Sequence, residues 1–357
     1  MRFVPSNCLR EGMSLGKTLY GRNNELVLSR GVELTSFFIE GIIRLGYSGV
    51  YIDDDISKDI EIINVISENV RQETINGMKK VFMKAERGQD FSDLKKDISF
   101  QMNSIVDELL KNRNLMVNMI DLKCFDNYTY AHSVNVAVLS VIIGISMGLK
   151  KELLFRLGLG AIMHDIGKVF VDKNIINKPG KLTNDEYKLV KTHPMAGYRY
   201  IREKFMLPST SYDVIIDHHE KYDGTGYPHS KSGDRISLFG RIAAIADVYD
   251  ALTSKRPYRA ALNPSESIEH IMGNCGVSFD TEIVQIFIRK VAPYPVGTTV
   301  RLSNGLTGLV TENYETHCLR PRIRVIKDDE SAVTPYEIDL KDDFSYLNVT
   351  IEGIINE

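Results

Sequence analysis

Histidine residues are concentrated in one part of this chain. Five of its eight histidines lie between residues 132 and 219, two of them adjacent, and two aspartates lie among or soon after them: His132, His164, Asp165, His193, His218, His219 and Asp247. A single histidine on an apolar helix is more often a core or surface residue than a ligand. Imidazole is nevertheless the commonest metal-binding side chain, and carboxylates can bridge two ions. The cluster therefore predicts a metal site.

The stretch from Gly160 to Lys168 places two of these residues side by side. We expect His164 and Asp165 to lie on one helix, where neighbouring positions diverge by about 100°. Both reach metal only if the ions lie across that face, with Asp165 as a bridge. Lys168 lies one turn further along the same face, where a cation suits a phosphoryl oxygen or a leaving group. The alternative is a surface lysine that caps the helix near Gly167.

Two sequence motifs carry a resemblance to a known family. His164-Asp165 with Gly167-Lys168 resembles the HDxGK signature of the HD phosphohydrolase superfamily. Residues 218–228, HHEKYDGTGYP, match the HHExxDGxGYP signature of the HD-GYP family in full. The flanking pieces 128–129, 192–194, 246–252 and 256–259 are also similar to that family. The resemblance covers roughly residues 120–293 and is specific, because both motifs are present in the right order.

The resemblance implies a site for two metal ions. His132, His164, Asp165 and Asp247 would hold one ion, while His193, His218 and His219 would hold the second, with Asp165 shared. A ligand set of nitrogen and oxygen without thiolate favours iron or manganese. A water bridging the ions would ionise near neutral pH and attack phosphorus in line.

The substrate implied by the resemblance is cyclic di-GMP, hydrolysed to pGpG and in a further step to GMP. Lys168 and Asp165 would be the catalytic residues, with Lys168 supporting the phosphate or the departing 3′ oxygen. Arg256 and Arg259 would clamp the other phosphate or a guanine edge, for which the planar guanidinium is well suited.

The loop that ends the second motif is formed by Asp223, Gly224, Gly226, Tyr227 and Pro228. Two glycines and a proline within six residues predict a loop of special geometry. Its alternative interpretation is a tight structural turn that packs Tyr227. We expect Asp223 to support the loop and not to bind metal.

The chain departs from part of the family at one position. Some members bind three metals and carry a glutamate shortly before the position of His132, where this chain has Tyr128. Asp126 is six residues from His132 and off the same helix face. We therefore expect two metals, and our hypothesis is that hydrolysis then stops at pGpG.

Three other functions fit parts of the sequence. The enzyme could act on another cyclic dinucleotide, such as cyclic GMP-AMP. The domain could be a non-catalytic signalling module that contacts GGDEF-type proteins through the GYP loop, although both motifs are intact. A general HD phosphohydrolase acting on nucleotides is the third, and the GYP motif argues against it.

Composition limits the classes of partner. The chain has 44 basic and 47 acidic residues, a net charge of −3 and a calculated pI of 6.3. This balance argues against a protein that wraps DNA or RNA duplexes. The four cysteines form no CxxC pair, which favours reduced thiols. We find no signal-peptide pattern, interpret the apolar run 134–147 as a buried core helix, and expect a cytoplasmic protein without a membrane partner.

The expected fold is mainly α, with four regions. Residues 1–55 predict a small α/β domain with strands at 25–28 and 49–52 and a helix at 35–44. Residues 56–119 predict connecting helices, broken near Arg87-Gly88, which could join domains, cover the core or pair with a second subunit in a homodimer. Residues 120–293 predict the helical HD-GYP domain, with helix starts at Thr183 and Asn263. Residues 294–357 predict a β-rich unit with a hairpin turn at Asn304-Gly305.

Overall fold

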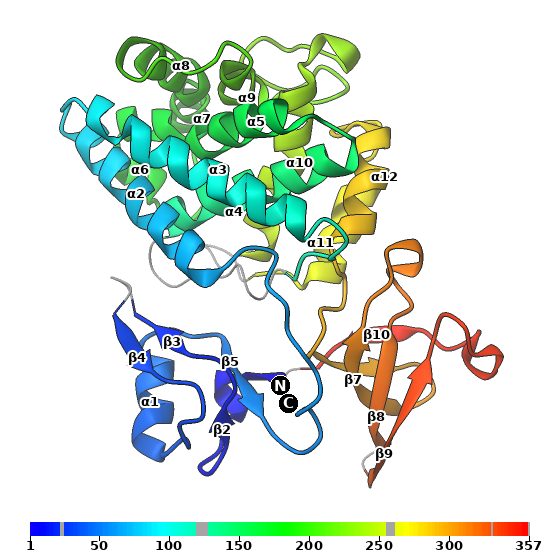
Figure 1. Ribbon diagram of the computed structural model, residues 1–357. Coiled ribbons are helices and arrows are strands. Elements are labelled where there is room, and N and C mark those ends of the chain that lie inside the picture. Colours follow the sequence, from blue (N-terminus) through cyan, green and yellow to red (C-terminus); the bar gives the residue numbers. More distant parts are fainter. Residues whose placement is uncertain (22–24, 119–127, 255–260, 330, 356–357) are drawn as a thin grey trace.

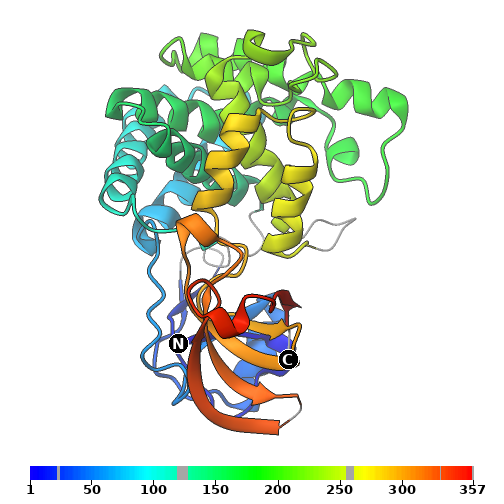
Figure 2. The ribbon, with the colours of Figure 1, turned by 90° about the vertical axis from the view of Figure 1, so that its right-hand side faces the viewer.

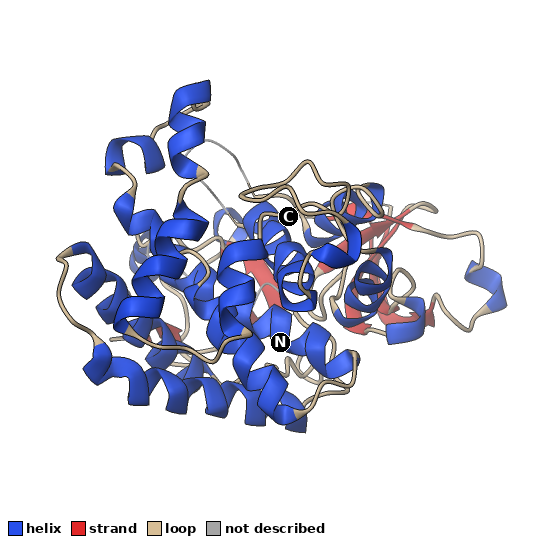
Figure 3. Cartoon of the chain, turned by 90° about the horizontal axis from the view of Figure 1, so that it is seen from above, coloured by secondary structure: helices blue, strands red, loops and turns tan. Residues whose placement is uncertain are grey.

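The computed structural model describes residues 1–357 except 22–24, 119–127, 255–260, 330 and 356–357. Three separate hydrophobic cores organise the described residues, one in a helical domain and one in each of two smaller units. The helical domain lies above the two units, which lie beside each other (Figure 1). Seen from above, the helices cover most of the strands (Figure 3). The fold is mainly α, as the sequence predicts.

The N-terminal unit packs one helix against short antiparallel strands. Its elements are β1 (Arg2–Pro5), β2 (Ser14–Leu15), β3 (Leu19–Tyr20), β4 (Leu26–Leu28), α1 (Ser36–Arg44) and β5 (Gly49–Asp53). The strand order is β1-β5-β2, with β3 and β4 as a separate pair. Helix α1 begins where Thr35 accepts a hydrogen bond from the backbone of Phe38, a common way to satisfy an orphan amide. The predicted helix and both predicted strands are confirmed.

The connecting region differs from the prediction in its first part. Helices α2 (Glu68–Glu86) and α3 (Lys95–Lys111) are present, and they separate near Arg87-Gly88 as expected. The chain before Glu68 is not helical, so the prediction for residues 56–67 was wrong. Backbone carbonyls there accept hydrogen bonds from side chains of other elements, Ile56 from Arg324 and Val65 from Asn112. These tertiary bonds replace helical ones, although the apolar spacing resembled a helix.

The start of α2 is fixed from outside the helix. Ser67 caps it by accepting from the backbone of Val70, and Ser67 also donates from its backbone and its hydroxyl to Glu108 of α3. Residues of α2 and α3 belong to the same core as the helical domain. The two helices therefore cover this core.

The helical domain holds the predicted run of helices. They are α4 (Tyr128–Ser146), α5 (Lys151–Met163), α6 (Lys173–Ile176), α7 (Asn184–Val190), α8 (His193–Lys204), α9 (Ser211–Asp217), α10 (Leu238–Thr253), α11 (Pro264–Gly273) and α12 (Thr281–Lys290). Capping boxes begin α7 and α11 at the predicted residues, Thr183 and Asn263. In α4, the window Thr129–Ser146 is long and apolar enough to cross a membrane, but 78% of it is buried in the protein. It is the core helix that the sequence predicts.

The C-terminal unit is a five-stranded antiparallel sheet. It contains β6 (Thr299–Leu302), β7 (Leu306–Glu312), β8 (Arg322–Asp328), β9 (Ser331–Asp339) and β10 (Ile351–Ile354), in the order β10-β6-β7-β8-β9. The predicted hairpin turn is confirmed between β6 and β7, where Gly305 has a φ of +89°. That conformation suits glycine.

Contacts join this sheet to the rest of the chain. Arg324 of β8 forms two 2.6 Å bonds to the carboxylate of Asp59, in a turn of the segment before α2. Phe3 of β1 donates its backbone N–H to Gly297, just before β6. Both views show the two small units together beneath the helical domain (Figures 1 and 2).

Candidate metal centre

Seven predicted ligands come together from five helices. His132 lies in α4, His164 and Asp165 follow the last residue of α5, His193 begins α8, His218 and His219 follow α9, and Asp247 lies in α10. All but His219, whose side chain is about a quarter exposed, are buried. Their donor atoms form two groups, His132 with His164 and Asp247, and Asp165 with His193, His218 and His219. We call these the first and the second ligand set.

The HD pair does not lie on one helix, contrary to the prediction. Helix α5 ends at Met163, and a 3-10 turn, η3 (Ile166–Phe170), follows Asp165. Gly167 lets this turn pack closely against α8, because a Cβ on it would lie 1.9 Å from the backbone oxygen of His193. Only glycine lets η3 approach the start of α8 so closely. The turn thereby brings Asp165 and His193 together.

The first ligand set has short distances between its polar atoms. His132 Nε2 lies 3.1 Å from Asp247 Oδ1, and His164 Nε2 lies 4.0 Å from the same oxygen. His164 Nε2 is buried and has no hydrogen-bond partner among the described residues. A buried nitrogen without a partner is costly unless a ligand satisfies it.

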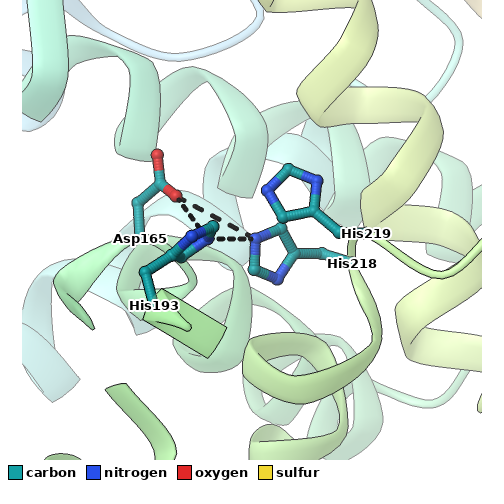
Figure 4. A group of neighbouring side chains, drawn as sticks. All are labelled: Asp165, His193, His218 and His219. Atoms are coloured by element: carbon teal, nitrogen blue, oxygen red, sulfur yellow. Dashed lines mark hydrogen bonds and ion pairs between the residues drawn. The ribbon is translucent and has the colours of Figure 1, made fainter. Parts of the chain in front are cut away.

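The second ligand set is equally compact (Figure 4). His193 Nε2 lies 3.3 Å from His218 Nε2, and Asp165 Oδ1 lies 3.4 Å and 3.9 Å from these two nitrogens. Asp165 Oδ1 is also buried without a hydrogen-bond partner among the described residues. Three imidazoles and one carboxylate oxygen thus point toward one small space.

Asp165 faces both sets, one oxygen to each. Its Oδ2 lies 3.3 Å from His164 Nε2 and 3.6 Å from His132 Nε2, while Oδ1 faces the second set. This arrangement suits a carboxylate that bridges two ions. It agrees with the shared role that the family resemblance implies for Asp165.

Outer contacts fix the histidine tautomers. The Nδ1 atoms of His164, His193 and His218 lie 2.7–3.0 Å from backbone carbonyl oxygens. A carbonyl oxygen can only accept, so each Nδ1 carries the proton and each Nε2 has a free lone pair. For His132 the acceptor is the carboxylate of Asp250, 2.7 Å away, which also accepts from Asn135.

The protonation states also suit metal binding. Burial lowers the pKa of His193 to about 4 and the pKa of His219 to about 3, so both are neutral at pH 7. Burial would raise the pKa values of Asp165 and Asp247, but the neighbouring histidines, and Lys168 in the case of Asp165, hold both well below the usual range. Neutral imidazoles and ionised carboxylates are the forms that bind metal.

His132 behaves differently from these histidines. Burial would lower its pKa, but hydrogen bonds and charges of Asp247 and Asp250 raise it to about 9. Its imidazole is therefore protonated at pH 7 when no metal is bound. A metal ion in the first set must displace that proton.

Lys168 lies beside the shared carboxylate. Its Nζ is 2.5 Å from Asp165 Oδ2, and its side chain is 29% exposed. The cation can therefore reach both this oxygen and a ligand from solution. Arg256 and Arg259, the other predicted substrate residues, lie outside the described residues, as do Asp126 and the side chain of Tyr128.

The GYP loop borders the second ligand set. Tyr227 stacks on His219, with ring centroids 4.7 Å apart, and the Tyr227-Pro228 peptide bond is cis. A Cβ on Gly226 would lie 2.3 Å from the backbone nitrogen of Lys221, and Gly224 has a φ of +86°. The exposed Asp223 accepts hydrogen bonds from the backbone and hydroxyl of Thr225. It supports the loop, as expected.

Sequence reasoning missed two buried carboxylates. Asp250 orients His132, and Glu220 anchors the GYP loop by accepting from the backbone N–H groups of His229 and Lys231 at 2.7 and 3.0 Å. Both residues belong to the quoted motifs. Asp250 also lies three residues after Asp247, on the same helix face, which was an available signal.

A family model matches the helical domain. Residues 114–283 match the family described as the HD domain. This part of the chain is similar to that family, and residues 218–228 carry the complete HHExxDGxGYP motif. HD-domain phosphodiesterases depend on metal, and the His/Asp cluster could hold it.

Named relatives come from several bacteria. The chain is 39% identical over 235 residues to a cyclic di-GMP phosphodiesterase, PA4108, of Pseudomonas aeruginosa, covering 65% of this chain and 56% of the relative. It is 35% identical to 3'3'-cGAMP-specific phosphodiesterase 1 of Vibrio cholerae, covering 55% of this chain and 45% of the relative. The chain thus spans about half the length of these relatives.

One solved structure aligns with most of the chain. It is Bd1817, a HDG"Y"P protein from Bdellovibrio bacteriovorus, with a TM-score of 0.49 and 16% identity. The alignment covers 80% of this chain and 97% of that one.

Proposed function

We propose that this protein is a metal-dependent phosphodiesterase that hydrolyses cyclic di-GMP. The observation that carries the proposal is the position of Asp165 between two complete ligand sets, with one carboxylate oxygen facing each. Relatives named cyclic di-GMP phosphodiesterases support the choice of substrate. A two-ion site beside a lysine suits the cleavage of a phosphodiester.

Two divalent transition-metal ions, iron or manganese, would occupy the site. His132, His164 and Asp247 would hold one ion, His193, His218 and His219 the other, and Asp165 both. When bound, they would activate a water for in-line attack and stabilise charge on the phosphoryl oxygens. The donor set supports this choice, since the described ligands are imidazole nitrogens and carboxylate oxygens.

The protein side chains supply orientation and charge. Backbone acceptors at Nδ1 keep the imidazoles of His164, His193 and His218 turned with Nε2 toward the cluster. The ammonium group of Lys168, which contacts Asp165, would also contact a phosphoryl oxygen or the departing 3′ oxygen of the substrate and stabilise its negative charge. Arg256 and Arg259 would bind the other phosphate or a guanine edge.

The main experiment combines metal analysis with turnover. Protein purified without oxygen should contain two transition-metal ions per chain and should convert cyclic di-GMP. The variant His164→Ala should lose turnover, because it removes a first-set ligand. Fewer than two ions together with no turnover would contradict the proposal.

A second candidate substrate is cyclic GMP-AMP. Relatives named 3'3'-cGAMP-specific phosphodiesterases, 32–39% identical to this chain, favour it. A competition assay with both dinucleotides decides between them. If the protein hydrolyses cyclic GMP-AMP in preference to cyclic di-GMP, then cyclic GMP-AMP is its substrate.

The product depends on the number of ions. With Tyr128 in place of a glutamate, we infer two ions and pGpG as the end product. Separating the products over time tests this inference. GMP as the main product would contradict it.

Contacts with partners stay predictions. A GGDEF-type protein could bind at the GYP loop, and a homodimer could form through the connecting helices. If the domain were a signalling module, His164→Ala would remove turnover and leave the partner contact intact. The cytoplasmic location also stays a prediction.

A further inference from the structure

Lys191 lies at the edge of the second ligand set. Its Nζ is 4.6 Å from the ring centroid of Tyr187 and 5.3 Å from that of Tyr227. Tyr227 itself stacks on His219. One aromatic ring therefore separates the ammonium group from a predicted metal ligand.

The charge of Lys191 is not neutralised by a described carboxylate. Other lysines nearby are paired, Lys178 with Glu186 at 2.7 Å and Lys188 with Asp185 at 2.8 Å. Lys191 instead contacts the faces of two tyrosine rings. An aromatic face attracts a cation through its quadrupole but carries no net charge. The ammonium group thus keeps its full charge for an anionic ligand.

The position of Lys191 is tied to the metal centre. It directly follows α7, and its backbone N–H donates to Tyr187. The carbonyl of Val190, the residue before it, accepts the hydrogen bond from Nδ1 of His193. The turn that carries Lys191 therefore also orients the predicted ligand His193.

We propose that Lys191 binds the phosphate of a cyclic dinucleotide that is not being cleaved. The proposal rests on the proposed function and deepens it. A cyclic dinucleotide has two phosphodiester groups in one ring, so a phosphate at the metal ions places the other at the rim. A compact ammonium group with three donors suits a phosphate oxygen there. Tyr187 and Tyr227 are positioning residues that hold this cation.

The test measures the binding of cyclic di-GMP to the metal-loaded protein by rapid mixing, within the time before the ligand is hydrolysed. Lys191→Met removes the charge and should weaken the binding of cyclic di-GMP by about tenfold or more, the size of one charged hydrogen bond. The remaining affinity should also depend less on salt, because one ion contact is lost. Lys191→Arg should retain most of the affinity, since a guanidinium also lies over aromatic rings.

Controls separate charge from structure. Lys188→Met changes an exposed lysine of α7, paired with Asp185, and should leave the affinity unchanged. Metal content should be equal in Lys191→Met and the unmodified protein. Reduced metal content would assign Lys191 a structural role and overturn the proposal.

The remaining outcomes are also decisive. Equal affinity of Lys191→Met and the unmodified protein, or no binding of cyclic di-GMP to the unmodified protein, would overturn the proposal. Binding that depends on Lys191 without turnover would support it and contradict the proposed catalytic function. Failure of the proposed role of Lys191 can therefore be distinguished from failure of the proposed catalytic function.

Discussion

Asp250 is buried, and its carboxylate is hydrogen-bonded to the predicted ligand His132. Its carboxylate accepts from His132 Nδ1 and from Asn135, which orients the ring toward the first ligand set. Such outer partners of metal-binding histidines commonly change metal affinity or activity by about 10–100-fold when removed. We therefore expect Asp250 to contribute to metal affinity, although it is not itself a predicted ligand.

We predict that Asp250→Asn lowers metal affinity in the first set by about 10–100-fold. The amide is a weaker acceptor for the His132 N–H, so the ring is held less firmly. Metal titration followed by elemental analysis measures the effect. Asp223→Asn is the matched control, because Asp223 is exposed and its carboxylate accepts its hydrogen bonds from Thr225 of the same loop. Equal metal content in both variants would refute the role of Asp250.

A second prediction concerns protons. The pKa of His132 is raised to about 9, above its ordinary value of 6.5, so the metal-free site is protonated at pH 7. Metal binding at pH 7 should release this proton, and apparent affinity should rise with pH until about 9. Calorimetry in two buffers of different ionisation enthalpy measures the release. Binding heats that are the same in both buffers would contradict it.

The same shift affects the stability of the metal-free protein. Because the folded pKa lies above the unfolded one, the stabilisation is present below pH 6.5 and is lost as pH rises through about 9.

At the scale of elements, the contact between η3 and α8 decides the geometry of the site. Gly167 lies against the backbone of His193 and Gly197. Backbone atoms cannot give way as a flexible side chain can. We predict that Gly167→Ala destabilises the protein by about 1–3 kcal/mol or more. Thermal unfolding measures the change.

Gly273→Ala is the control for that substitution. Gly273 ends α11, and a Cβ there would meet no atom within 4 Å. Its unfolding temperature should be unchanged or slightly higher, since alanine favours a helix. A similar loss of stability in both variants would show that the close approach at Gly167 is not the cause.

The same contact explains where sequence reasoning succeeded and failed. The seven residues that cluster could be predicted because their types and motifs are local in the sequence. The 3-10 turn after Asp165 could not be predicted, because it packs against α8, a distant segment. The prediction of a helix over residues 56–67 was wrong for a similar reason, since side chains of distant residues such as Asn112 donate hydrogen bonds to this segment. Periodicity indicates burial, but it does not reveal such partners.

At the scale of the whole molecule, Arg324 connects the sheet to the segment before α2. We predict that Arg324→Ala speeds hydrogen exchange in residues 54–67, because Asp59 and the carbonyl of Ile56 lose their donor. Mass spectrometry of exchanged peptides measures this. Arg301→Ala, at an exposed position of β6, should leave exchange there unchanged.

The contact should also respond to acid. The hydrogen bonds of Arg324 lower the pKa of Asp59 to about 2, below its ordinary value of 3.8. Its stabilisation is therefore present above pH 3.8 and is lost as pH falls through about 2. If residues 54–67 of the unmodified protein exchange as fast as those of Arg324→Ala already at pH 5, this prediction is contradicted.

The shared carboxylate of Asp165 would affect how the proposed site fills. Each of its oxygens faces a different ligand set, so an ion in one set would change the charge and the mobility of the carboxylate that serves the other. If both sets bind an ion, the two binding equilibria would be thermodynamically linked and the linkage reciprocal: whichever ion enters first would change the affinity for the other by the same factor. Loading curves would follow macroscopic constants of the pair, and a substitution in one set would shift the occupancy of both.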